Sequence, residues 1–189
     1  MANLIITIIS IALVAVAAIM GAYYGGSAFM QGQTKSYADA LVSQGDQITA
    51  AWTVYATNNS GNFSTLSALS TLTSGTTSAY LTDIPIPPRA IANISISPFT
   101  STWQMINLSN IFGSNGYDAV YITLTDDKNG LNVCNYVAQI AGGSSASPTP
   151  VSPADLTTTI TRKFDCVFYG AASATSTSAT LKFIYYRAY

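Results

Sequence analysis

The chain has 189 residues, of which 49% are hydrophobic and only 8% are charged. Seven basic residues stand against eight acidic ones, a net charge of −1, which excludes nucleic-acid binding by a strongly basic surface. This length predicts an N-terminal helix followed by one domain large enough to bury a core.

The first 34 residues contain no charged side chain, and positions 4–24 are almost all apolar. About 20 such residues are what a helix needs to cross a bilayer. A signal peptide would instead need a basic start, a shorter apolar core and a small-residue cleavage site. We therefore expect residues 1–34 to be retained, surrounded by lipid in one setting and by copies of the chain in another. The residues predicted to form this shared core are Leu4, Ile5, Ile8, Ile11, Ala12, Ala15 and Ile19.

A second helical pattern continues from this segment without a break. Its apolar positions recur every three or four residues, which is one stripe of a helix. We predict a single helix over 1–57, in which 1–34 is the membrane or filament core and 35–57 packs on a globular head. The stripe consists of Leu41, Gly45, Ile48, Trp52 and Tyr55.

Three glycines, Gly21, Gly25 and Gly26, lie where the segment that is apolar all round ends. Glycine weakens a helix interior by roughly 1 kcal/mol relative to Ala. We predict a helix break at these glycines. Because a subunit must leave the bilayer and repack, the loss of regularity is expected in an assembled filament.

The head is predicted over 58–189. Turn-forming residues at 58–62 end the helix, and 58–91 is read as a connecting loop. Three prolines near the end of this loop disfavour both a helix and a central strand. The loop is therefore expected to follow a surface in an extended conformation.

Strand-like and helix-like patterns then alternate along the head. A turn or cap at 126–130 precedes a predicted helix at 131–140, and 142–153 is read as an exposed low-complexity loop. The resulting fold class is α+β, a long N-terminal helix packed against an antiparallel sheet. Strands are predicted at 92–97, 102–108, 117–125, 156–161, 163–169 and 181–189.

The chain contains two cysteines, Cys134 and Cys166. In an exported chain an isolated pair favours one disulfide, for which only one connectivity exists. The alternative interpretation is two free buried thiols. Closing this loop would stabilise the head by roughly 3–4 kcal/mol in the loop-entropy model.

Little in the sequence indicates catalysis, since there is no His and no Glu. We expect no catalytic residue, no metal, no cofactor and no enzymatic activity. The acidic run at 126–130 lacks the ligand spacing and closing Glu of a calcium loop, so a helix cap is the favoured interpretation. Four N-glycosylation sequons occur where chance gives about 2.6, and their acceptors are Asn58, Asn62, Asn93 and Asn107.

Four stretches, taken in order, resemble the type IV pilins and within them the type IVb subgroup. They are the start MANLIITIISIALVAVAAIMGAYYGG, the helix end ATNNSG, the run YDAVYITLTDDKNGLNVCNYVAQI, and the strand material from Cys166 to Tyr189. The resemblance implies an αβ-loop at 58–91 and a disulfide-bounded D-region at 134–166. It also implies that Met1 is the mature, methylated N-terminus after removal of a leader. Pilins usually have Glu at the fifth mature position, where this chain has Ile5.

The resemblance implies a structural role, that of a major pilin which polymerises through its N-terminal helix into an extracellular pilus. The expected partners are other copies of the chain, the pilus assembly machinery and the prepilin peptidase, with no specific nucleic-acid site. The expected location is the cytoplasmic membrane before assembly and the cell surface afterwards. The alternatives are a membrane-anchored binding or adhesin domain, and a minor pilin or pseudopilin of a secretion or DNA-uptake system.

Overall fold

The structure is a computed structural model that describes residues 2–74, 79–91, 103–106, 117, 119–125, 127–142, 150–151, 163–169 and 180–186. The chain divides into two compact units, Met1–Ser36 and Tyr37–Tyr189. The strands predicted at 92–97 and 156–161 lie outside the described residues.

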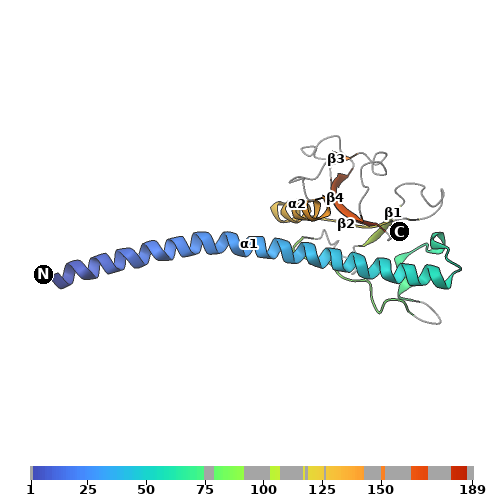
Figure 1. The fold of residues 1–189 in the computed structure, drawn as a ribbon, viewed down its shortest axis with the longest axis horizontal. Coiled ribbons are helices and arrows are strands. Elements are labelled where there is room, and N and C mark those ends of the chain that lie inside the picture. Colours follow the sequence, from blue (N-terminus) through green and yellow to red (C-terminus); the bar gives the residue numbers. More distant parts are fainter. Residues whose placement is uncertain are drawn as a thin grey trace. The chain divides into compact units, whose positions relative to one another are not determined.

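Helix α1, Ala2–Asn58, contributes residues to both units (Figure 1). It contains no proline, so no backbone hydrogen bond has to be lost along it, and it is rich in Ala, the strongest helix former. It ends within one residue of the predicted position, because Ser60 and Gly61 adopt φ angles of 60° and 74°. The Gly61 amide then donates to the Ala56 carbonyl at 2.8 Å, which satisfies a carbonyl that the helix end leaves open.

Two short 3-10 helices follow α1 in the second unit, η1 at Phe63–Thr65 and η2 at Leu69–Leu72. The indole N–H of Trp52, on α1, donates to the Phe63 carbonyl at 3.3 Å. This bond and the burial of Leu69 and Leu72 hold the connecting segment against α1.

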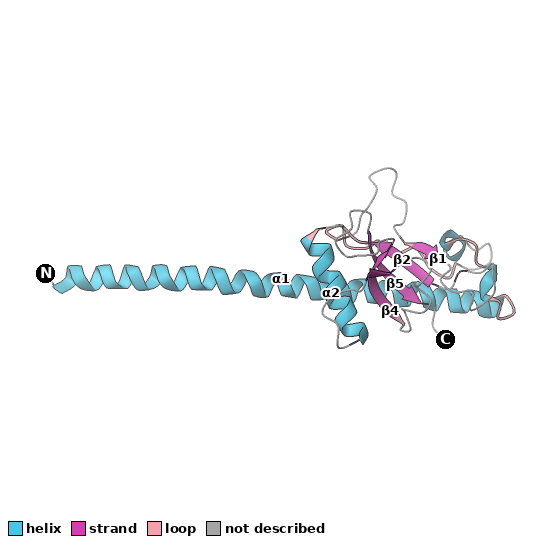
Figure 2. Cartoon of the chain, turned by 90° about the horizontal axis from the view of Figure 1, so that it is seen from above, coloured by secondary structure: helices cyan, strands magenta, loops and turns pink. Residues whose placement is uncertain are grey.

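The head contains a five-stranded sheet in the order β1-β2-β5-β4-β3. All pairs are antiparallel except β3 with β4, which is parallel. Figure 2 shows β2, β5 and β4 lying side by side in it. The strands are β1 Gln104–Ile106, β2 Ala119–Thr123, β3 Pro150–Val151, β4 Phe164–Tyr169 and β5 Thr180–Tyr186.

The structure confirms the α+β class, and β1, β2, β4 and β5 fall within or next to predicted strands. Helix α2 is Lys128–Gly142, longer at both ends than the predicted 131–140. One prediction was wrong in part, because the segment 142–153 read as loop contains β3. Pro150 has no amide hydrogen, and a two-residue strand at a sheet edge tolerates that loss.

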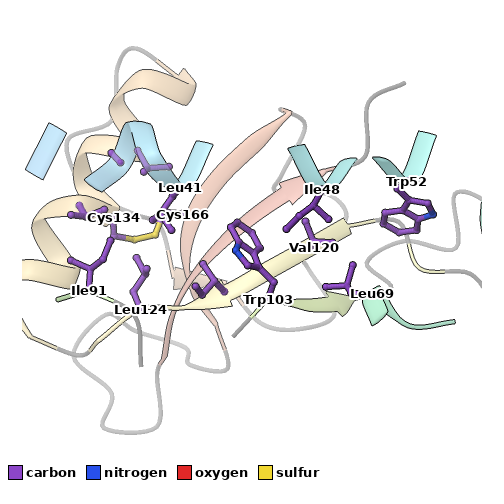
Figure 3. Packing of buried hydrophobic residues seen from close by; sticks show 14 of the residues in the cluster. Leu41, Ile48, Trp52, Leu69, Ile91, Trp103, Val120, Leu124, Cys134 and Cys166 are labelled. Carbon is purple, nitrogen blue, oxygen red and sulfur yellow. A yellow bond between two sulfur atoms is a disulfide. The ribbon is translucent and has the colours of Figure 1, made fainter. Parts of the chain in front are cut away.

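The core of the second unit lies between α1, the sheet and α2 (Figure 3). The predicted stripe of α1 faces inward: Leu41, Ile48 and Trp52 are fully buried, and Tyr55 is partly buried against the same cluster. β2 is the best predicted strand, and its residues are buried or half-buried throughout. The other buried members include Leu66, Leu72, Ile91, Trp103, Val120, Ile122, Leu124, Val133, Val137 and the two cysteines.

Candidate functional site

The most distinctive surface of the chain is the N-terminal part of α1, defined here as the apolar segment, residues 3–30. Its large apolar side chains are exposed, with Leu4 at 69% and Ile19 at 70% of their full accessible surface. Among the described residues, α1 is the one helix long and apolar enough to cross a membrane. The exposed members are Leu4, Ile5, Ile6, Ile8, Ile9, Ile11, Leu13, Val14, Val16, Ile19, Met20, Tyr23, Tyr24, Phe29 and Met30.

The serine and threonine hydroxyls inside the apolar segment are satisfied within the helix. The Thr7 hydroxyl donates to the Asn3 carbonyl at 2.8 Å, and the Ser10 hydroxyl donates to the Ile6 carbonyl at 2.9 Å. The segment has no ionisable acid or base between residue 3 and Lys35 apart from two tyrosines. Its surface can therefore enter an apolar environment without exposing an unpaired charge or an unsatisfied serine or threonine.

The predicted core residues Leu4, Ile5, Ile8, Ile11, Ala12, Ala15 and Ile19 are all exposed on this helix. Met1, the predicted mature N-terminus, lies outside the described residues. Gly21, Gly25 and Gly26 have open space where a Cβ would project, and α1 continues through all three without interruption. The expected break is therefore absent from the single chain. The loss of regularity in an assembled filament stays a prediction.

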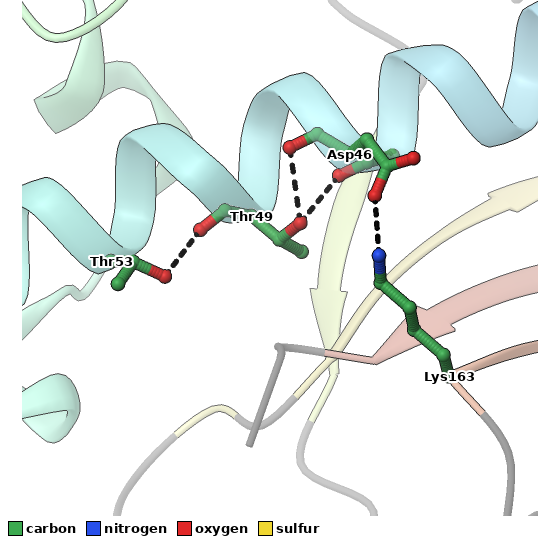
Figure 4. Close-up of polar contacts among 5 residues, drawn as sticks. Asp46, Thr49, Thr53 and Lys163 are labelled. Atoms are coloured by element: carbon green, nitrogen blue, oxygen red, sulfur yellow. Dashed lines mark hydrogen bonds and ion pairs between the residues drawn. The ribbon is translucent and has the colours of Figure 1, made fainter.

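The second half of α1 is fixed to the head by polar contacts as well as by its apolar stripe. Asp46 accepts an ion-paired hydrogen bond of 2.7 Å from Lys163, at the start of β4 (Figure 4). The carboxamide of Gln44 accepts a 3.4 Å bond from the Trp103 indole and donates at 3.0 Å to the Ile86 carbonyl. Gln44 thus connects the proline-containing loop to the residue that precedes β1. The sequence pattern did not single it out, because a glutamine on a helix usually faces solvent.

The cysteine pair forms a disulfide that joins α2 to β4. Cys134 and Cys166 have a Cα–Cα distance of 5.2 Å and are 0% and 1% exposed. Both sulfurs lie within the core cluster (Figure 3). The bond therefore fixes the first turns of α2 to the sheet from the inside, and neither thiol is free.

Within the turn predicted at 126–130, Asp127 caps α2, and Lys128–Gly130 are already the first residues of that helix. The Asp127 carboxylate accepts hydrogen bonds from the Gly130 amide at 2.8 Å and from the Thr125 hydroxyl at 2.9 Å. These bonds favour the ionised form and lower the pKa of Asp127 below its ordinary value of 3.8. Gly130 is buried so close to the connection between β2 and α2 that an added Cβ would lie 2.0 Å from the Thr125 carbonyl oxygen. Sequence reasoning missed this glycine, whose only signal was its place three residues after a capping Asp.

The described residues contain no cluster of acidic, cysteine or histidine side chains that could hold a metal. They do form an open hollow of about 320 Å³ between η2 and β1, lined by Ser70, Ile84, Trp103, Met105 and Tyr117, among others. The lining carries no carboxylate and no ammonium or guanidinium group. Chemically the lining mixes apolar side chains with hydroxyl and amide groups.

Two of the four candidate glycosylation acceptors are described, and both are exposed at the end of α1. The Asn58 amide donates to the Tyr80 hydroxyl at 3.3 Å, and Asn62 follows in the turn after the helix. Asn93 and Asn107 lie outside the described residues. Their modification stays a prediction.

No protein-family model, no curated protein and no solved structure matches this chain.

Proposed function

We propose that this chain is a filament subunit of the type IV pilin kind, held in a membrane by its apolar segment and then assembled through it. The observation that carries the proposal is an uncharged helix half that is exposed on all sides and continuous with a half that packs on a disulfide-closed head. A plain membrane anchor needs no such amphipathic continuation. The order of the elements is that of the pilins that the sequence resembles.

The energetics support assembly once the helix leaves lipid. Burying roughly 1,500 Å² of apolar side chain per subunit at about 25 cal/mol per Å² gives on the order of 40 kcal/mol. Association costs are about 4–15 kcal/mol, so the apolar term dominates. Small residues such as Ala12, Ala15 and Ala18 are exposed on the segment, and they let neighbouring helices approach closely.

The proposal assigns a structural role and no catalysis. The partners it implies are other copies of the chain, a peptidase that processes the N-terminus and a machinery that extracts the subunit from the membrane. The filament would then be displayed on the cell surface. If wild-type protein forms no filament, a membrane-anchored binding domain becomes the better proposal, and the hollow near Trp103 is where a ligand would be sought.

Ala15→Asp tests the assembly step. Ala15 is exposed in the apolar segment, and a buried unpaired carboxylate there would destabilise each subunit contact by several kcal/mol. We expect no filaments in sheared surface material examined by electron microscopy, while the head keeps its disulfide. Ala50→Asp is the matched control, because Ala50 is an exposed alanine of the same helix outside the apolar segment. Normal filaments from Ala15→Asp would contradict the proposal.

A further inference from the structure

In the described part of the first unit, four serine and threonine hydroxyls form hydrogen bonds within the helix, whereas the tyrosine hydroxyls and the asparagine carboxamide do not. The hydroxyls of Thr7, Ser10, Ser27 and Thr34 each donate to a backbone carbonyl three or four residues earlier. In the part of the chain that the structure describes, the Tyr23 and Tyr24 hydroxyls and the Asn3 carboxamide have no hydrogen-bond partner. They need partners outside the chain.

These unsatisfied groups bracket a helix length that matches a bilayer. Asn3 and Tyr23 are 20 residues apart, which corresponds to roughly 30 Å of helix. The hydrocarbon core of a typical bilayer is also about 30 Å thick. Between the two ends, every described serine and threonine hydroxyl is satisfied by the helix itself.

The two tyrosines are exposed in the manner expected of interfacial residues. Tyr23 and Tyr24 are 77% and 70% exposed, and their rings meet edge to face at 5.7 Å. Tyr is enriched where an apolar ring can lie in lipid while its hydroxyl reaches water or headgroups.

We infer that Tyr23 and Tyr24 bind the phospholipid headgroup interface, so that the hydrocarbon boundary crosses α1 at these two residues. Their hydroxyls donate to the ester carbonyl or phosphate oxygens of the lipid, and Asn3 lies at the opposite interface. The next segment, 25–34, then lies among headgroups and water. This inference rests on the membrane stage of the proposed function.

The competing boundary lies at Met30, the last large apolar residue before Gln31. A span from Leu4 to Met30 would be roughly 40 Å long, about 10 Å more than the hydrocarbon core. It would also place two phenol hydroxyls in hydrocarbon without partners. Both consequences favour the boundary at the tyrosines.

Spin labels test the boundary in the full-length protein reconstituted into dioleoyl-phosphatidylcholine vesicles. The substitutions Ala12→Cys, Ala22→Cys and Ala28→Cys, made one at a time, each provide a thiol for a nitroxide label. The native cysteines are not labelled, because they are joined in the disulfide. Collision rates with oxygen report hydrocarbon, and collision rates with a water-soluble nickel chelate report the aqueous side. We expect oxygen to dominate at Ala12 and, less strongly, at Ala22, whereas the nickel chelate dominates at Ala28, roughly 6 Å beyond Tyr24.

Oxygen dominance at Ala28 in an inserted protein would overturn the inference and leave the membrane stage of the proposed function standing. Nickel dominance at all three positions would show that the helix does not insert, and would overturn both. These two failures are therefore distinguishable in one data set.

A second set of variants tests whether the hydroxyls hold the boundary. The double substitution Tyr23→Phe and Tyr24→Phe is expected to shift the Ala28 label inward, with a several-fold rise in its oxygen-to-nickel collision ratio. Phe29→Leu is the matched control, which changes an exposed aromatic residue without removing a hydroxyl and leaves the ratio unchanged. An unchanged ratio in the double variant would overturn the assigned role of the two tyrosines.

Discussion

Gly130→Ala probes the contact between α2 and Thr125, in the connection that follows β2. Gly130 is buried in the first turn of α2, and its amide donates to the capping carboxylate of Asp127 at 2.8 Å. A Cβ added there would lie 2.0 Å from the Thr125 carbonyl oxygen and 2.9 Å from the Thr125 hydroxyl oxygen. Real Cβ atoms essentially never approach backbone closer than 3.0 Å, so α2 or Thr125 would have to move by about 1 Å.

Two opposing effects set the magnitude. Alanine is favoured over glycine in a helix by about 1 kcal/mol. Forced displacement of packed backbone costs about 1–3 kcal/mol, occasionally more. Movement is also resisted at both ends, because the Thr125 amide donates to the Ile91 carbonyl at 2.8 Å and Cys134 joins α2 to β4. We therefore place the displacement cost at the upper end of its range, about 3 kcal/mol, and expect Gly130→Ala to lower the free energy of unfolding by about 2 kcal/mol net.

The assay is denaturant unfolding of the detergent-solubilised chain under non-reducing conditions, followed by the fluorescence of the buried Trp52 and Trp103. Asn132→Ala is the matched control, because Asn132 is exposed on the same helix and its substitution should change stability by only a few tenths of a kcal/mol. If Gly130→Ala is as stable as wild type or more stable, the close approach of α2 to Thr125 is wrong.

Two further predictions concern the same region. Replacing Cys134 and Cys166 together by alanine opens a loop with a sequence separation of 32 residues. It should lower the free energy of unfolding by roughly 4 kcal/mol. A loss below about 1 kcal/mol in denaturant unfolding would contradict the stabilisation assigned to the disulfide. Asp127 has a folded-state pKa below 3.8, so its capping contribution is fully present above that pH and is lost as the pH falls through the lower folded value. Asp127→Ala should therefore lower the free energy of unfolding by about 0.5–2 kcal/mol at pH 7, and by progressively less below pH 3.8. Denaturant unfolding at each pH measures this difference. An equal loss at pH 7 and well below pH 3.8 would refute the role of the ionised carboxylate.

Local pattern was sufficient where a segment's neighbours along the chain decide its structure. The apolar stripe of Leu41, Ile48 and Trp52 predicted both the helix and its buried face, because helical periodicity is visible in any window of the sequence. The end of α1 followed from turn residues at 58–62, and β2 followed from its β-branched and aromatic residues. The disulfide could be predicted from the presence of two cysteines in a chain with the composition of an exported protein.

Tertiary contacts decided the features that depend on residues far apart in the sequence. Gly130 is required by the Thr125 carbonyl that the fold brings beside it, and Gln44 is fixed by Trp103, 59 residues away. The short β3 exists because β4 offers it an edge to pair with. The sheet order places β5 between β2 and β4, and no local pattern specifies that neighbour relation. The sequence determines which face of each element must be buried. It does not determine which other element covers that face, because the hydrophobic effect is non-directional and close packing of the folded backbone selects the neighbour.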